Sequence, residues 1–137
     1  MDNINTMGNL FSIKKINFEN IQDYIKSGNE YLLINTMSPE TQTCLIATTI
    51  IASSEEEKIN KYIHSGRDIP IIIYGKNTND EKVFLKYKQL INFGFKNIYV
   101  YLGGMFEWLC LQDIYGKEEF PTTIVEKDLL RYKPPKF

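Results

Sequence analysis

The sequence is short of the residues that build most metal and thiol centres. It has a single histidine, His64, and only two cysteines, Cys44 and Cys110, which lie far apart and form no C-x-x-C pair. A histidine-based metal site needs a second histidine, and a zinc ribbon needs paired cysteines. The sequence therefore predicts no metal site, no cofactor, and two cysteines that stay reduced.

Long apolar runs and an excess of one charge are also missing. No apolar stretch approaches the length of a membrane span, and residues 1–5 lack the basic start and apolar run of a secretion signal. With 16 basic and 17 acidic residues, the formal net charge is −1, which argues against charge-driven binding to nucleic acid or to an anionic membrane. We expect a cytoplasmic protein with neither as a partner.

The 137 residues are 43% hydrophobic and 13% aromatic, which suits one self-folding domain. Short runs rich in β-branched residues predict strands, and amphipathic stretches between glycines predict helices. Asn17 is the predicted N-cap of the first helix, and Ser54 with Glu57 forms the capping box expected to start the second. The predicted strands cover residues 13–16, 31–34, 44–51, 69–74 and 98–102.

The most informative stretch runs from Ile69 to Trp108. An apolar run ends in Tyr74 and Gly75, and a polar loop then leads into a helix that stops at Gly94. A second strand follows and breaks at Gly103-Gly104, shortly before Trp108. This strand, helix, strand order is a β-α-β unit, which implies a parallel sheet. The helix has one apolar face, formed by Val83, Phe84, Tyr87, Leu90 and Ile91.

These features resemble the second half of a rhodanese-like domain, the fold of sulfurtransferases and related cell-cycle phosphatases. The resemblance covers roughly residues 13–112 and implies an α/β fold. We expect a three-layer α/β/α sandwich around a mostly parallel five-stranded sheet. The expected organisation is a polar lead-in at 1–12, a rhodanese-like domain at 13–116, and a C-terminal extension at 117–137 that packs on the domain.

The resemblance also implies a catalytic cysteine directly after the strand's tyrosine, in a loop that cradles an anion. Gly75 stands there, and Asn35-Thr36 replaces the acidic and basic residues that commonly end the preceding strand. A persulfide or phosphocysteine needs a thiolate, so we expect the family's fold without its chemistry and assign no catalytic residue. Asp80 is expected to fill the loop itself. The predicted ligand-binding residues are Gly75, Lys76, Asn77, Thr78, Asn79 and Asp80, with Asn35 and Gly103 beside them.

Three functions remain open. The first is a catalytically silent binding or regulatory module, with a protein partner on the loop at 75–80 or on the C-terminal tail. The second is a thiosulfate-type sulfurtransferase or a thiol redox enzyme that uses a displaced cysteine. Cys44 is the better candidate than Cys110, although it begins the expected strand at 44–51 and so falls on the wrong rim of the sheet. The third is a scaffold whose contact surface is the tail from Phe120 onward. The apolar residues of that tail are expected to dock it back on the domain: Phe120, Ile124, Leu129 and Leu130.

Overall fold

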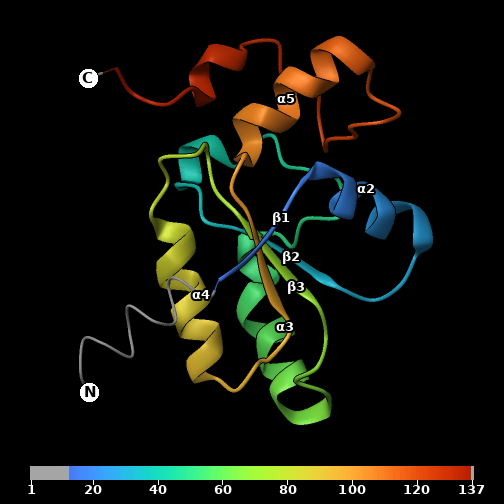
Figure 1. The fold of residues 1–137 in the computed structure, drawn as a ribbon, viewed down its shortest axis with the longest axis vertical. Coiled ribbons are helices and arrows are strands. Elements are labelled where there is room, and N and C mark those ends of the chain that lie inside the picture. Colours follow the sequence, from blue (N-terminus) through green and yellow to red (C-terminus); the bar gives the residue numbers. More distant parts are fainter. Residues whose placement is uncertain (1–12, 137) are drawn as a thin grey trace.

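The computed structural model describes residues 13–136, and the polar lead-in expected at 1–12 lies outside them. Strands and helices alternate along most of the chain (Figure 1). None of the helices in this described part is long and apolar enough to cross a membrane. In order, the elements are β1 (Lys14–Ile16), α2 (Phe18–Ser27), β2 (Leu32–Asn35), η1 (Pro39–Thr41), α3 (Ala52–Ser65), β3 (Ile71–Tyr74), α4 (Lys82–Asn92), β4 (Ile98–Tyr101), α5 (Gly104–Tyr115) and η2 (Leu129–Tyr132).

The strands form one parallel sheet in the order β1-β4-β3-β2. Asn35 of β2 is in register with Tyr74 of β3, and Tyr74 is in register with Tyr101 of β4. Because the strands are parallel and aligned, their carboxyl ends meet at one edge of the sheet. Ligands of open parallel sheets bind beyond that edge.

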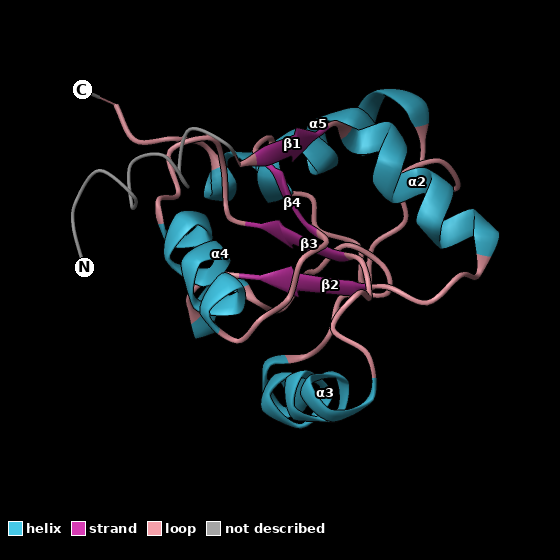
Figure 2. Cartoon of the chain, turned by 60° about the horizontal axis from the view of Figure 1, so that its bottom comes forward, coloured by secondary structure: helices cyan, strands magenta, loops and turns pink. Residues whose placement is uncertain are grey.

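The sheet is the middle of three layers, as expected (Figure 2). One face is covered by α2 and α5, which bury Ile21 and Trp108. The other face is covered by α3 and α4, which bury Ile59 and Leu90. β2, β3 and β4 read as near-continuous apolar runs because both of their faces are buried, whereas the edge strand β1 is mostly exposed. The core expected from the sequence is confirmed, since each of these side chains is buried: Ile34, Ile46, Ile71, Ile73, Val83, Leu90, Val100 and Trp108.

Both ends of α2 follow the sequence signals, whereas in α3 the end at Gly66 does and the start does not. The side chain of Asn17 accepts a hydrogen bond from the N–H of Glu19, and Gly28 ends α2 with a left-handed φ of 72°. The capping box predicted at Ser54 is wrong, because α3 already begins at Ala52. The N–H of Ser54 donates to the carbonyl of Ile51, which places Ser54 inside the first turn.

The strand predicted at residues 44–51 is also wrong, so the sheet has four strands rather than five. Cys44, Leu45 and Ile46 are buried, but as a loop with one antiparallel bridge, between Ile46 and Thr122. Side chains help to satisfy the backbone here: the N–H of Ile46 donates to the hydroxyl of Tyr74. An apolar run predicts burial, and it forms a strand only where a neighbouring strand is free to pair with it.

The tail after α5 folds back over α5 and the loop at 44–47 (Figure 1). Phe120 is buried against Trp108 and Phe18, and the carbonyl of Pro121 accepts from the N–H of Ala47. Leu129 packs against the core as expected, whereas Ile124 and Leu130 are 48% and 66% exposed, so the docking predicted for these two is wrong. Tyr132, which was not among the predicted core residues, is fully buried.

Replacing Phe120 with alanine should lower the free energy of unfolding by about 3–5 kcal/mol, because it empties a packed aromatic site. Leu130→Ala, on the exposed side of the same tail, should change it by less than about 0.5 kcal/mol. Urea denaturation of both variants measures this. Equal, small effects would show that the tail does not pack on the domain.

Candidate functional site

The carboxyl edge of the sheet brings the predicted ligand-binding residues together. Asn35 ends β2, the loop at 75–80 follows β3, and Gly103 lies between β4 and α5. The side chain of Asn35 is buried, and its Oδ1 accepts from the N–H of Met37. Gly75 and Asn77 are buried within the loop, whereas Thr78 and Asn79 are exposed at its tip.

The carboxylate of Asp80 is the centre of this loop. One oxygen, Oδ2, accepts from the N–H of Lys76 at 3.0 Å and from the hydroxyl of Thr36 at 3.2 Å. The other oxygen, Oδ1, accepts from the N–H of Lys82, the first residue of α4, at 3.0 Å. The expectation that Asp80 caps the free amides of the loop is therefore confirmed. An incoming anion would compete with a covalently tethered carboxylate for the same donors.

Gly75 is required by the position of Asp80. A Cβ atom on Gly75 would lie 2.7 Å from both the Cβ and the Cγ of Asp80, well inside van der Waals contact. The Asp80 Cβ is fixed to the backbone, so this overlap cannot be relieved by a rotamer change alone. A cysteine at position 75 does not fit beside Asp80 as the loop stands.

The double glycine locks α5 onto the same loop. The N–H groups of Met105 and Phe106 donate to the carbonyls of Gly75 and Lys76, both at 2.9 Å. Gly104 has a left-handed φ of 68°, and a Cβ there would lie 2.7 Å from the carbonyl oxygen of Gly75. Only glycine permits this approach. Two of the first amides of α5 therefore hydrogen bond to the loop and hold it in place.

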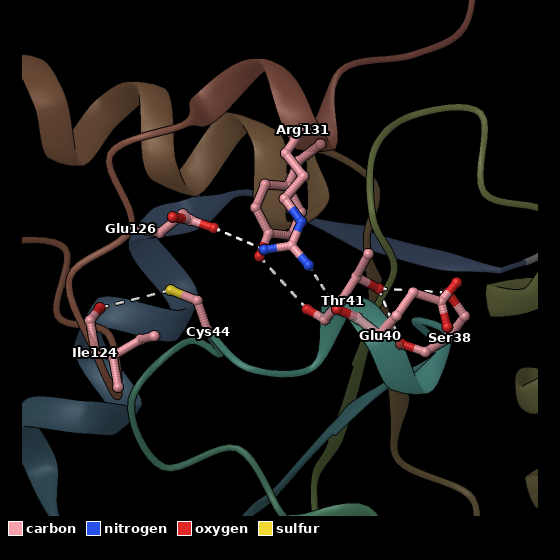
Figure 3. Close-up of polar contacts among 8 residues, drawn as sticks. Ser38, Glu40, Thr41, Cys44, Ile124, Glu126 and Arg131 are labelled. Carbon is pink, nitrogen blue, oxygen red and sulfur yellow. Dashed lines mark hydrogen bonds and ion pairs between the residues drawn. The ribbon is translucent and has the colours of Figure 1, made fainter.

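The tail closes over the loop from the other side. The amide of Asn77 donates to the carbonyl of Tyr132 at 2.9 Å. Arg131 donates to the carboxylate of Glu126 at 3.1 Å and to the backbone carbonyl of Glu40 at 2.7 Å, so the tail is also tied to η1 (Figure 3). The loop at 75–80 and the tail thus form one continuous surface.

The two thiols are placed apart from this loop. Cys44 is fully buried and its Sγ faces the carbonyl of Ile124, and burial raises the pKa of its thiol (Figure 3). Burial, with Asp113 and Glu107 nearby, also raises the pKa of Cys110. Contrary to the prediction, Cys44 does not begin a strand on the wrong rim, because residues 44–51 form no strand of the sheet. Burial of Cys44 disfavours its thiolate form.

His64 lies in the last turn of α3, as expected, and takes no part in this site. Within residues 13–136, no three His, Cys, Asp or Glu side chains gather closely enough to hold a metal ion.

A family model matches most of the structured part of the chain. The model of the rhodanese-like domain matches residues 39–110, more than half of the chain. A search of the curated proteins found no match. The match ends inside α5, so the tail that closes over the loop lies outside it.

Solved structures share the fold at low sequence identity. The crystal structure of the Alr3790 protein from Anabaena sp. aligns with a TM-score of 0.58 at 17% identity, over 86% of this chain and all of that one. The solution structure of the rhodanese-like domain from the same Anabaena protein aligns with a TM-score of 0.55 at 17% identity, over 90% of this chain and 86% of that one. At this identity the likeness shows the fold alone.

The contact between Gly75 and Asp80 can be measured as a coupling energy. Gly75→Ala alone should destabilise the protein by about 1–3 kcal/mol. In an Asp80→Gly background the same change should cost less, because the overlapping side chain is gone, with a coupling of about 0.5–3 kcal/mol. Gly66→Ala, which meets open space, is the matched control and should be additive with Asp80→Gly. Additivity of Gly75→Ala would contradict the packing described.

Both thiols should react slowly in the folded protein. Because burial raises the pKa of each, less thiolate is present at pH 7, and iodoacetamide should alkylate the native protein more slowly than the urea-unfolded chain. The alkylation rate of the native protein should rise only as the pH passes above the ordinary pKa of a thiol. Mass spectrometry of each cysteine peptide measures it. Faster alkylation of either cysteine in the native state would identify an activated thiol.

Proposed function

Because the chain belongs to the rhodanese-like domain family, we propose that it is a non-catalytic binding or regulatory member of that family. The observation that carries this proposal is the carboxylate of Asp80 in the loop after β3, hydrogen bonded to Lys76, Lys82 and Thr36. The position at which the family resemblance implies a nucleophilic cysteine then belongs to Gly75.

The chemistry of sulfur transfer supports this proposal. A persulfide forms only on a thiolate, and the loop amides must be free to stabilise it and its anionic substrate. Gly75 has no side chain, and Asp80 takes the amides of Lys76 and Lys82. The loop therefore lacks the nucleophile, and two of its amides are already occupied.

The alternative is a sulfurtransferase or redox enzyme that uses Cys44 or Cys110. Both thiols are unpaired, which fits a reducing compartment such as the cytoplasm. The raised pKa of each thiol disfavours the thiolate that such an enzyme would need. The raised pKa values favour structural roles for the two cysteines.

A protein partner fits this non-catalytic proposal. The sequence left two surfaces open for such a partner, the loop at 75–80 and the tail. The hydrogen bond from Asn77 to the carbonyl of Tyr132 joins them, so a partner that covers one also meets the other. A separate scaffold role for the tail then becomes part of the same proposal.

The purified protein should show no turnover of thiosulfate and cyanide above a protein-free control. Gly75→Cys should stay inactive, because its side chain overlaps Asp80; adding Asp80→Gly makes room for the thiol and should give the first measurable turnover. Cys44→Ser and Cys110→Ser should behave as wild type. Wild-type turnover that vanishes in either serine variant would overturn the proposal and place the active site at that thiol.

A further inference from the structure

A groove runs along the carboxyl edge of the sheet, outside the loop that Asp80 fills. It consists of two adjoining clefts, of about 360 Å³ and 480 Å³, which share Met37 and Lys82. The first lies between the loop and the tail, with Lys76 and Lys133 on its walls. The second lies between the end of β2 and α4, with Asn35 and Leu85 on its walls. We name this surface, lined by Lys76, Lys82, Lys133, Asn35 and Leu85, the lysine groove.

Three segments of the chain each contribute an ammonium group to the groove. Lys76 comes from the loop, Lys82 from the start of α4, and Lys133 from the tail. Within residues 13–136, the lysines and arginine that form ion pairs are Lys26, Lys86 and Arg131, so none of the three groove lysines is paired there. The whole chain has a net charge of −1, so this positive charge is concentrated at the groove and is not a property of the whole surface.

The carboxylates at the groove offset its charge only in part. Asp80 lines the first cleft and carries one negative charge, against three lysines. Glu40 lies at the rim, where its carboxylate accepts from the hydroxyl of Ser38 at 2.7 Å. That bond, with Lys82 and Lys76 adding to it, lowers the pKa of Glu40, so the field of the two lysines reaches the rim. Glu40 offsets part of the positive charge, and the balance stays positive.

A buried amide also faces the groove. Asn35 is only 6% exposed and lines the second cleft. Its Oδ1 accepts from Met37, while its Nδ2 donates to no acceptor in the described part of the chain. No fully buried side-chain polar atom in that part lacks a partner, so this Nδ2 reaches the open cleft. A carboxylate or carbonyl in the cleft would satisfy it.

We propose that the lysine groove binds an extended acidic segment of a protein partner. Carboxylates of the segment meet Lys76, Lys82 and Lys133, its backbone or a further carboxylate meets the amide of Asn35, and an apolar side chain covers Leu85, which is 70% exposed. Two adjoining clefts offer more room than a single small anion fills. This inference rests on the proposed function, because it names the partner of the same surface.

The probe is a short fluorescein-labelled peptide of Asp and Glu with one central Leu, titrated with the full chain in fluorescence anisotropy. Its Asn and Gln analogue is the uncharged control. We expect binding of the acidic peptide that weakens as salt is added. Lys82→Gln with Lys133→Gln should weaken it about tenfold, since two exposed charge contacts are lost. Lys58→Gln with Lys61→Gln on α3 removes the same charge elsewhere and should leave binding unchanged.

Equal weakening by the two pairs of substitutions would overturn the proposal, because the attraction would then be non-specific. Absence of peptide binding would overturn the proposal and indicate a groove without a ligand. Displacement of the peptide by inorganic phosphate at the same concentration of negative charge would overturn it in favour of a small-anion site. The thiosulfate assay on the same preparations separates the two proposals. Thiol-dependent turnover contradicts the non-catalytic function, whereas a silent protein without peptide binding contradicts the groove alone.

Discussion

The carboxylate of Asp80 holds three segments of this domain together. It accepts from the hydroxyl of Thr36 after β2, from the amide of Lys76 after β3, and from the amide of Lys82 at the start of α4. Its position forces glycine at residue 75, and the carbonyls of Gly75 and Lys76 in turn receive the first amides of α5. A loop built in this way already holds the amides of Lys76 and Lys82 and leaves fewer of its donors free for an anion.

The same loop determines where the tail lies. Asn77 is held inside the loop and donates to the carbonyl of Tyr132, while Arg131 reaches the carbonyl of Glu40. The tail therefore brings Lys133 to the edge of the sheet, beside Lys76 and Lys82. The inner loop and the outer groove differ in charge as a result: the loop is closed by a carboxylate of the chain itself, and the groove is lined by lysines that form no ion pair in the described part of the chain.

Most of the fold could be predicted from local sequence patterns. The apolar runs of β3 and β4, the helical spacing in α4, and Asn17 as an N-cap each depend on near neighbours in sequence, and the structure agrees with them. The apolar run at residues 44–51 predicts burial correctly but strand pairing wrongly, because its partners are the tail and the hydroxyl of Tyr74. In the site, Asp80 could be anticipated as a cap, but its overlap with Gly75 and the hydrogen bond from Asn77 to Tyr132 depend on tertiary packing. The spacing of Leu129 and Tyr132, three residues apart, was the one available signal for the buried tyrosine.

Amide hydrogen exchange tests most directly whether Asp80 fills the loop. The account predicts that the Lys76 and Lys82 amides are protected in the wild-type protein and that Asp80→Ala strongly accelerates exchange of Lys76. The amide of Ile72 in β3 reports on global unfolding. In both proteins it should exchange more slowly than the loop amides. Unchanged protection of Lys76 in Asp80→Ala would contradict the account, because another acceptor would then hold the loop.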